Sequence, residues 1–151
     1  MKLVIASDHA GVKLKNKLCD ILSKKYELED ASPLNTPTDD YPDFAFKVGN
    51  KVAKDENSLG ILICGTGIGM SIAANKVKGI RCALVTDEHS SKYARRDDDA
   101  NIIALPSTID IDLAVACCEL FINTEFCTDE EKYYRRKKKV LDYESGEYNE
   151  L

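Results

Sequence analysis

The stretch Leu59-Gly60-Ile61-Leu62-Ile63-Cys64-Gly65-Thr66-Gly67-Ile68-Gly69-Met70 decides the fold. Its first half is a continuous apolar run, which is typical of a central parallel strand that is buried on both faces of a sheet. Three alternating glycines then lead into a helical segment. We therefore expect a strand, a tight turn and a helix, with backbone N–H groups exposed at the turn.

The same alternation of strand and helix extends through the chain on both sides of this stretch. Further strands are expected at 3–6, 26–30, 80–86 and 102–105, and further helices at about 14–22, 44–52, 88–96 and 110–121. This order predicts an α/β fold, a Rossmann-like three-layer sandwich with a five-stranded, mostly parallel sheet and helices on both faces. In such sheets, ligands bind beyond the carboxyl ends of the strands.

Length and composition limit the class of protein. The 151 residues suit one domain, 1–151. A net charge of −5 argues against general attraction to nucleic acid or to an anionic membrane. We expect a cytoplasmic protein because no segment is apolar and long enough for a membrane span or an export signal. The six cysteines lack Cys-x-x-Cys spacing, so we expect reduced thiols and no metal or cofactor.

The C-terminal segment is strongly charged. Glu130 and Glu131 come early and the basic run Arg135 to Lys139 comes late, an order that complements a helix dipole. We expect a helix at about 129–143 that docks on a partner subunit.

The glycine-rich turn differs from better-known glycine motifs. A Walker A loop needs Lys and then Ser or Thr after its last Gly, and no Lys occurs between Gly60 and Asn75. A dinucleotide fingerprint has different glycine spacing. A cysteine phosphatase loop needs Arg at the position of Met70. The turn therefore predicts an anion site of another kind.

Four polar side chains are candidates for this site, each with a simpler interpretation beside it. Cys64 lies next to the helix start, where the positive end of the helix dipole favours a thiolate, so a base or nucleophile and a packed core cysteine are equally open. Thr66 either caps the helix or faces the anion. Asp8 and His9 end the first strand at the edge where Cys64 is expected, which favours a site over a surface cap. His89 is expected to be solvated.

The chain resembles the ribose-5-phosphate isomerase B and galactose-6-phosphate isomerase family over nearly its full length. The matching segments are Ser7–Gly11, Asp40–Ala45, Gly60–Lys76, Gly79–Arg81 and Asp99–Asn101. The long central match is specific, and several linked motifs occur in one order.

The resemblance implies metal-free interconversion of an aldose phosphate and a ketose phosphate through a cis-enediolate, with ribose 5-phosphate as the first expectation. It assigns the base to Cys64 and proton movement between the substrate oxygens to Thr66. Preorganised amides lower the barrier to such chemistry by roughly 3 to 4 kcal/mol each. The implied binding residues are the turn amides of Gly65, Gly67, Ile68 and Gly69, the sugar contacts Asp8 and Tyr41, and the phosphate contact His9.

Several positions depart from the family pattern. Asp97 and Asp98 stand where the family has a ring-opening His-Asn pair, so the resemblance implies a catalytic role for Asp97 and substrate binding by Asp98. Thr108 replaces a phosphate-binding Arg. A carboxylate is a weaker base than imidazole, so ring opening is the least secure step. Arg135 and Lys139 fit the family's two basic phosphate ligands at i, i+4 spacing, with a solvated basic run as the alternative.

The resemblance also implies active sites between subunits, and hence a homodimer or tetramer. The same departures, together with Gly146-Glu147-Tyr148, are similar to the Cys-containing subunit of galactose-6-phosphate isomerase, whose companion subunit supplies missing groups. That subunit, or another hexose-6-phosphate isomerase, is the second hypothesis. A non-catalytic sugar-phosphate-binding protein is the third.

Overall fold

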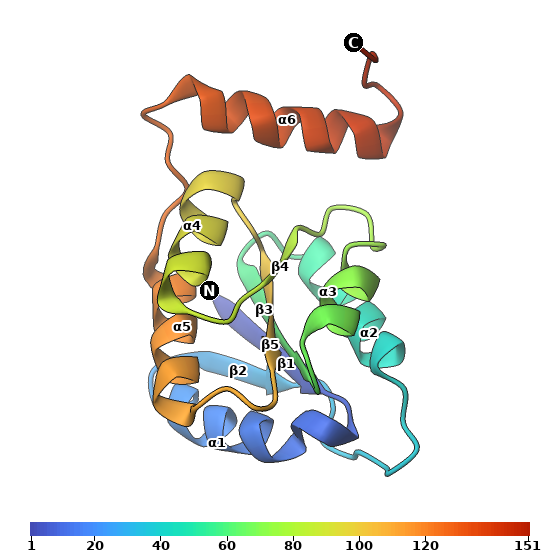
Figure 1. Ribbon diagram of the computed structural model, residues 1–151, viewed down its shortest axis with the longest axis vertical. Coiled ribbons are helices and arrows are strands. Elements are labelled where there is room, and N and C mark those ends of the chain that lie inside the picture. The colour runs from blue at the N-terminus through green and yellow to red at the C-terminus, as the bar shows by residue number, and fades with distance from the viewer.

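A computed structural model describes all of residues 1–151. Five strands form one sheet between two layers of helices (Figure 1). In their order across the sheet, the strands are β2 (Glu27–Asp30), β1 (Lys2–Ser7), β3 (Ser58–Cys64), β5 (Ile102–Pro106) and β4 (Cys82–Leu84). Every neighbouring pair is parallel. The expected α/β sandwich is confirmed, and the sheet is parallel throughout.

Each face of the sheet carries its own apolar core. One core joins the sheet to α1 (Val12–Leu22), α4 (Glu88–Asp98) and α5 (Ile111–Asn123), and the other joins it to α2 (Tyr41–Ala53) and α3 (Ile68–Ala74). Side chains of β3 alternate between the two, with Ile61 and Ile63 on one side and Leu62 and Cys64 on the other. All seven residues of β3 are buried, which explains its unbroken apolar sequence.

Gly60 lets α2 approach the central strand. A Cβ atom at this position would lie 2.8 Å from Cγ1 of Ile102 and 2.9 Å from Cγ1 of Val48 in α2. Both distances are below normal carbon contact, so the helix packs directly on the strand backbone.

The expectation of a buried strand over 80–86 was wrong in length and in burial. β4 has only three residues, and of these Leu84 is exposed. The cause is its place in the sheet: β4 pairs with β5 alone and forms the edge, so one side of it meets no other strand.

Helix α6 (Glu131–Ser145) stands apart from both layers. It lies across the end of the sheet at which the strands begin, opposite the ends to which their arrows point (Figure 1). A single side chain of α6, that of Tyr133, is buried. None of the helices combines the length and the apolar character needed to cross a bilayer.

Gly60→Ala is expected to lower the free energy of unfolding by about 1–3 kcal/mol, because the added methyl group overpacks the contact between α2 and β3. Denaturant unfolding measures the change. Gly65→Ala is the matched control, since a Cβ there would meet no atom within 4 Å. Equal stability of the two variants would contradict this account of the close approach.

Candidate functional site

The carboxyl ends of three adjacent strands bring the first group of candidates together. Ser7 of β1 pairs with Ile63 of β3, so Asp8 and Cys64, one residue further on, lie side by side. The chain after β5 is tied to the same place, since the Ser107 amide donates a 2.8 Å hydrogen bond to the Cys64 carbonyl. This is the edge at which parallel sheets bind ligands.

Cys64 is both a core residue and the residue at the head of the turn. Its side chain belongs to the core on the α2–α3 face, and only 4% of the residue is exposed. Its sulfur accepts a 3.2 Å hydrogen bond from the Gly67 amide. The sulfur is therefore buried in the core and also hydrogen-bonded to the turn that starts α3.

The turn amides divide into used and unused donors. The Gly67 amide is engaged by the sulfur, and the Ile68 amide donates to Oγ1 of Thr66 at 3.2 Å. The N-cap of α3 is Gly67, so Thr66 binds the first amide of the helix from the residue before the cap. The amides of Gly65, Thr66 and Gly69 make no hydrogen bond within the chain. These three donors, rather than the whole run 65–69, are free to bind an anion.

Gly67 and Gly69 are required at their positions. Gly67 adopts a left-handed conformation with φ of 76°, and a Cβ atom there would lie 2.7 Å from Leu84. At Gly69, a Cβ atom would lie 2.7–3.0 Å from ring atoms of Tyr41. The Tyr41 ring therefore packs directly against the turn, and its contact with a sugar stays a prediction.

His9 is held by a carboxylate that the sequence did not single out. Asp39 Oδ1 accepts hydrogen bonds from the His9 backbone amide at 2.7 Å and from His9 Nδ1 at 2.9 Å. The hydrogen bond to Asp39 raises the pKa of His9. Although burial opposes it, hydrogen bonds from Asn35, His9 and Thr36 lower the pKa of Asp39 to about 2. The pair thus favours an imidazolium ion at this edge.

Asp8 is the most buried carboxylate of this edge, with 6% of the residue exposed. Its Oδ1 accepts a 3.0 Å hydrogen bond from the Ala10 amide, at the start of the short helix η1 (His9–Gly11). Burial raises the pKa of the Asp8 carboxyl, and the Ala10 hydrogen bond opposes this.

The remaining candidates lie at the opposite end of the sheet, where the strands begin. Asp97 and Asp98 end α4, which starts after β4 and runs its 11 residues back along the sheet, about 16 Å, to the side where β5 begins. Arg135 and Lys139 are exposed on α6, and Arg135 pairs with Glu131 of the same helix at 2.5 Å. Within one chain, this second group does not reach Cys64.

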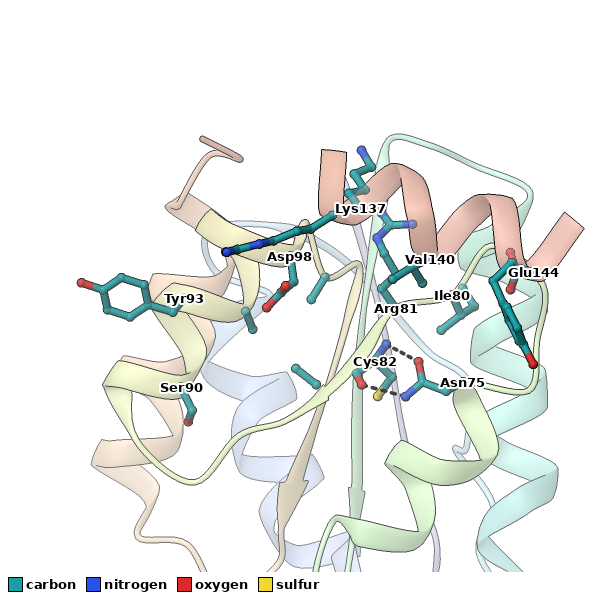
Figure 2. A pocket seen from close by; sticks show the side chains of 15 residues that line it. Asn75, Ile80, Arg81, Cys82, Ser90, Tyr93, Asp98, Lys137, Val140 and Glu144 are labelled. Carbon is teal, nitrogen blue, oxygen red and sulfur yellow. Dashed lines mark hydrogen bonds between the residues drawn. The ribbon is translucent and has the colours of Figure 1, made fainter. Parts of the chain in front are cut away.

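A cavity of about 770 Å³ lies between β4, α4 and α6 (Figure 2). Asp98 of α4 lies at its margin, and Tyr93, Val140 and Tyr143 give it apolar walls. Arg136 lines the same cavity and is the cation close enough to oppose the rise in the pKa of Asp98, which is caused by burial and then by the charge of Asp97.

Arg136 lines this cavity and was not among the candidates from the sequence, while binding by Arg135 and Lys139 stays a prediction. The i, i+4 spacing of Arg135 and Lys139 was a valid helical signal, but spacing alone does not say which side of α6 meets α4. No three His, Cys, Asp or Glu side chains are grouped so as to hold a metal ion.

The chain is similar to known proteins over most of its length. Residues 3–140 match the family model of the ribose/galactose isomerases. A Mycoplasma genitalium protein named probable ribose-5-phosphate isomerase B is 41% identical over 94% of this chain and 95% of its own. The crystal structure of ribose-5-phosphate isomerase B from Mycoplasma genitalium with bound ribulose-5-phosphate superposes with a TM-score of 0.89 at 40% identity, covering 95% of this chain and 96% of that one. The Clostridium thermocellum ribose-5-phosphate isomerase B gives a TM-score of 0.90 at 40% identity, covering 97% and 99%.

Asp39→Asn is expected to lower the pKa of His9 towards its ordinary value of 6.5, because the variant loses the charged acceptor at Nδ1. Titration of the His9 ring by NMR measures this change. Asp40→Asn is the matched control, as Asp40 makes no hydrogen bond to His9. An unchanged titration in Asp39→Asn would contradict the assignment.

The same pair sets a pH window for its contribution to stability. The raised pKa of His9 means that the contribution is lost as pH rises through that value, and the lowered pKa of Asp39 means that it is lost as pH falls towards 2. It is fully present between 3.8 and 6.5, the ordinary values of the two groups.

Proposed function

The chain belongs to the ribose/galactose isomerase family and is a sugar-phosphate isomerase, and on that premise we propose that it interconverts ribose 5-phosphate and ribulose 5-phosphate with Cys64 as the base. The observation that carries the proposal is the turn after β3, where one sulfur lies beside three unpaired amides. The named relatives above support the pentose over a hexose substrate.

Proton transfer beside a carbonyl needs a base and a site for the oxyanion. Cys64 removes the proton from C2 and returns it to C1. The negative charge that develops on oxygen is met by the amides of Gly65, Thr66 and Gly69, each of which contributes roughly 3 to 4 kcal/mol to such a transition state. The Thr66 hydroxyl lies in the same turn, where it can pass the second proton between the two oxygens.

The other residues of this edge bind the ends of the substrate. Asp8 and Tyr41 flank the turn and serve as hydrogen-bond partners for sugar hydroxyls. His9, kept protonated by Asp39, offers a cation to the phosphate.

We further propose that each site is completed by a second copy of the chain in a homodimer or a larger assembly. Two features support this. Asp97 and Asp98, together with Arg135, Arg136 and Lys139 of α6, lie at the end of the sheet opposite Cys64. A site that contains both groups therefore requires two chains. The cavity beside the edge strand β4 also exposes apolar side chains, Val140 and Tyr143, that a partner would cover.

In this proposal, the sugar ring is opened by one of the two carboxylates at the end of α4, Asp97 or Asp98. Asp97 forms an ion pair with Arg96 at 2.6 Å. Burial and the charge of Asp97 raise the pKa of Asp98, and a base of higher pKa accepts a proton more readily. Asp98 also lines the cavity between β4, α4 and α6, whereas Asp97 is engaged by Arg96. We therefore favour Asp98, in place of the Asp97 expected from the sequence, as the residue that takes the proton of the anomeric hydroxyl.

Cys64→Ala is expected to lower kcat for ribose 5-phosphate by about 10²–10⁴-fold, the usual contribution of a positioned base. Colorimetric detection of ribulose 5-phosphate measures it, and Cys127→Ala is the control. Parallel assays with allose 6-phosphate and galactose 6-phosphate test the substrate assignment. Full turnover by Cys64→Ala would eliminate the proposed base, and faster turnover of a hexose phosphate would eliminate the pentose.

Asp98→Asn is expected to slow the reaction from ribose 5-phosphate by about 10²-fold. The value of kcat/KM from ribulose 5-phosphate should fall by the same factor, because the equilibrium constant fixes the ratio of kcat/KM in the two directions and the residue that opens the ring also closes it. Initial rates in both directions measure the losses, with Asp97→Asn as the matched variant. Unchanged rates in Asp98→Asn, or the larger loss in Asp97→Asn, would refute the assignment.

A further inference from the structure

Asp99 is the centre of an ion cluster that the isomerase chemistry does not use. It follows Asp98 at the end of α4 and is the only residue other than glycine with a positive φ, 49°. Its carboxylate pairs with Arg81 before β4, with Arg95 of α4 and with Lys137 of α6. One anion therefore joins three cations from three parts of the chain, and its side chain is only 16% exposed.

On the side facing the sheet, hydrogen bonds hold the ion cluster in place. Arg81 Nε donates a 2.8 Å hydrogen bond to the Asp99 carbonyl, and the Arg81 amide donates to Asn101 Oδ1 at the same distance. Asn101 Nδ2 in turn donates to the Gly79 carbonyl at 2.9 Å. Residues 79–81 and 99–101 thus form one hydrogen-bonded unit at the start of β4 and β5, with Asp99 facing α6.

Helix α6 is held to this unit by few contacts. Cavities of about 770 and 500 Å³ lie along it, and Lys137 lines both. Apart from the Lys137 pair, its polar links to the sandwich are Arg96 to the Tyr133 hydroxyl at 3.2 Å and the Gly79 amide to Glu144 at 2.8 Å. With so little packing, the position of α6 depends on these links, and the Lys137 pair is the central one.

We propose that the Asp99–Lys137 ion pair is a positioning contact that fixes α6 against the end of α4, so that Asp98 and Arg136 are presented together to the active site of a partner subunit. The inference rests on the proposed function, because it concerns the half of the site that one chain donates to another. Asp99 is adjacent to Asp98, and Lys137 is adjacent to Arg136. The pair therefore sets the spacing between the ring-opening carboxylate and Arg136, the cation of α6 that lines the same cavity and that the proposal assigns to the substrate phosphate.

Lys137→Met tests the contact with little risk to the fold, since it keeps the apolar stem and leaves Asp99 paired with two arginines. Lys138→Met is the matched control, because Lys138 bonds only Asp142 within α6, at 2.6 and 2.9 Å. We expect Lys137→Met to raise KM for ribose 5-phosphate about tenfold, as a misplaced phosphate cation would. Lys138→Met should change KM by less than about twofold.

Hydrogen exchange provides a readout that does not depend on activity. The amides of 131–145 should exchange at least about tenfold faster in Lys137→Met, while those of the sheet remain unchanged. Unchanged protection of α6 would overturn the positioning role of the Asp99–Lys137 pair, whether or not the chain isomerises ribose 5-phosphate.

Mixed assemblies show which site the contact serves. Chains with Cys64→Ala are combined with chains carrying Lys137→Met under conditions in which subunits exchange, and KM and kcat are measured. If Lys137 acts on the part of the site that its chain donates to the partner, each mixed dimer has one site that combines an intact Cys64 with an intact Lys137. About a quarter of the sites in the mixture then have wild-type KM. Cys64→Ala combined with Arg136→Ala is the benchmark for donation.

The outcomes separate the two proposals. Recovery with Arg136→Ala but none with Lys137→Met would mean that Lys137 acts within its own chain, and would overturn the inference. Recovery with neither would overturn the two-chain site and the inference with it. Absence of isomerisation by the wild-type protein would refute the proposed function itself. The hydrogen-exchange measurement would still show whether the Asp99–Lys137 pair holds α6 in place.

Discussion

The hydrogen bond between the Gly67 amide and the Cys64 sulfur is the interaction on which the site depends. It joins the last residue of a fully buried strand to the start of α3, and so fixes the sulfur of the proposed base to the central strand of the sheet. Glycine at 67 permits the left-handed turn, and glycine at 69 admits the Tyr41 ring. The sheet therefore serves as a support that holds a thiol and unpaired amides in one geometry before any substrate arrives.

The fold was largely accessible from the sequence, because hydrophobic periodicity reports burial directly. The continuous run of β3 predicted a central strand, and the alternation of elements predicted the parallel sandwich. The length and burial of β4 were not predictable in the same way. Ile80 and Val85 flank a three-residue edge strand and are buried in the cores on opposite faces of the sheet, and a sequence pattern does not show which buried residues belong to the strand.

The candidate site was accessible only in part. Asp8, Cys64 and Thr66 follow strand ends, so their shared edge could be inferred from parallel topology. The Asp39 contact to His9 depends on the path of the loop between β2 and α2, which no local pattern specifies. The choice among the cations of α6 depends on the rotation of a helix held by a few polar links. The path of this loop and the rotation of α6 are set by tertiary contacts, which a local sequence pattern does not report. The candidate residues consequently lie at two opposite ends of the sheet.

The most direct test of the central claim is a crystal structure of the assembled protein with ribulose 5-phosphate bound. The account predicts C1 or C2 of the sugar within about 3.5 Å of the Cys64 sulfur, a near-attack distance. It also predicts the adjacent oxygens on the amides of Gly65, Thr66 and Gly69. A sugar bound elsewhere, with the sulfur still covered and those amides empty, would contradict it.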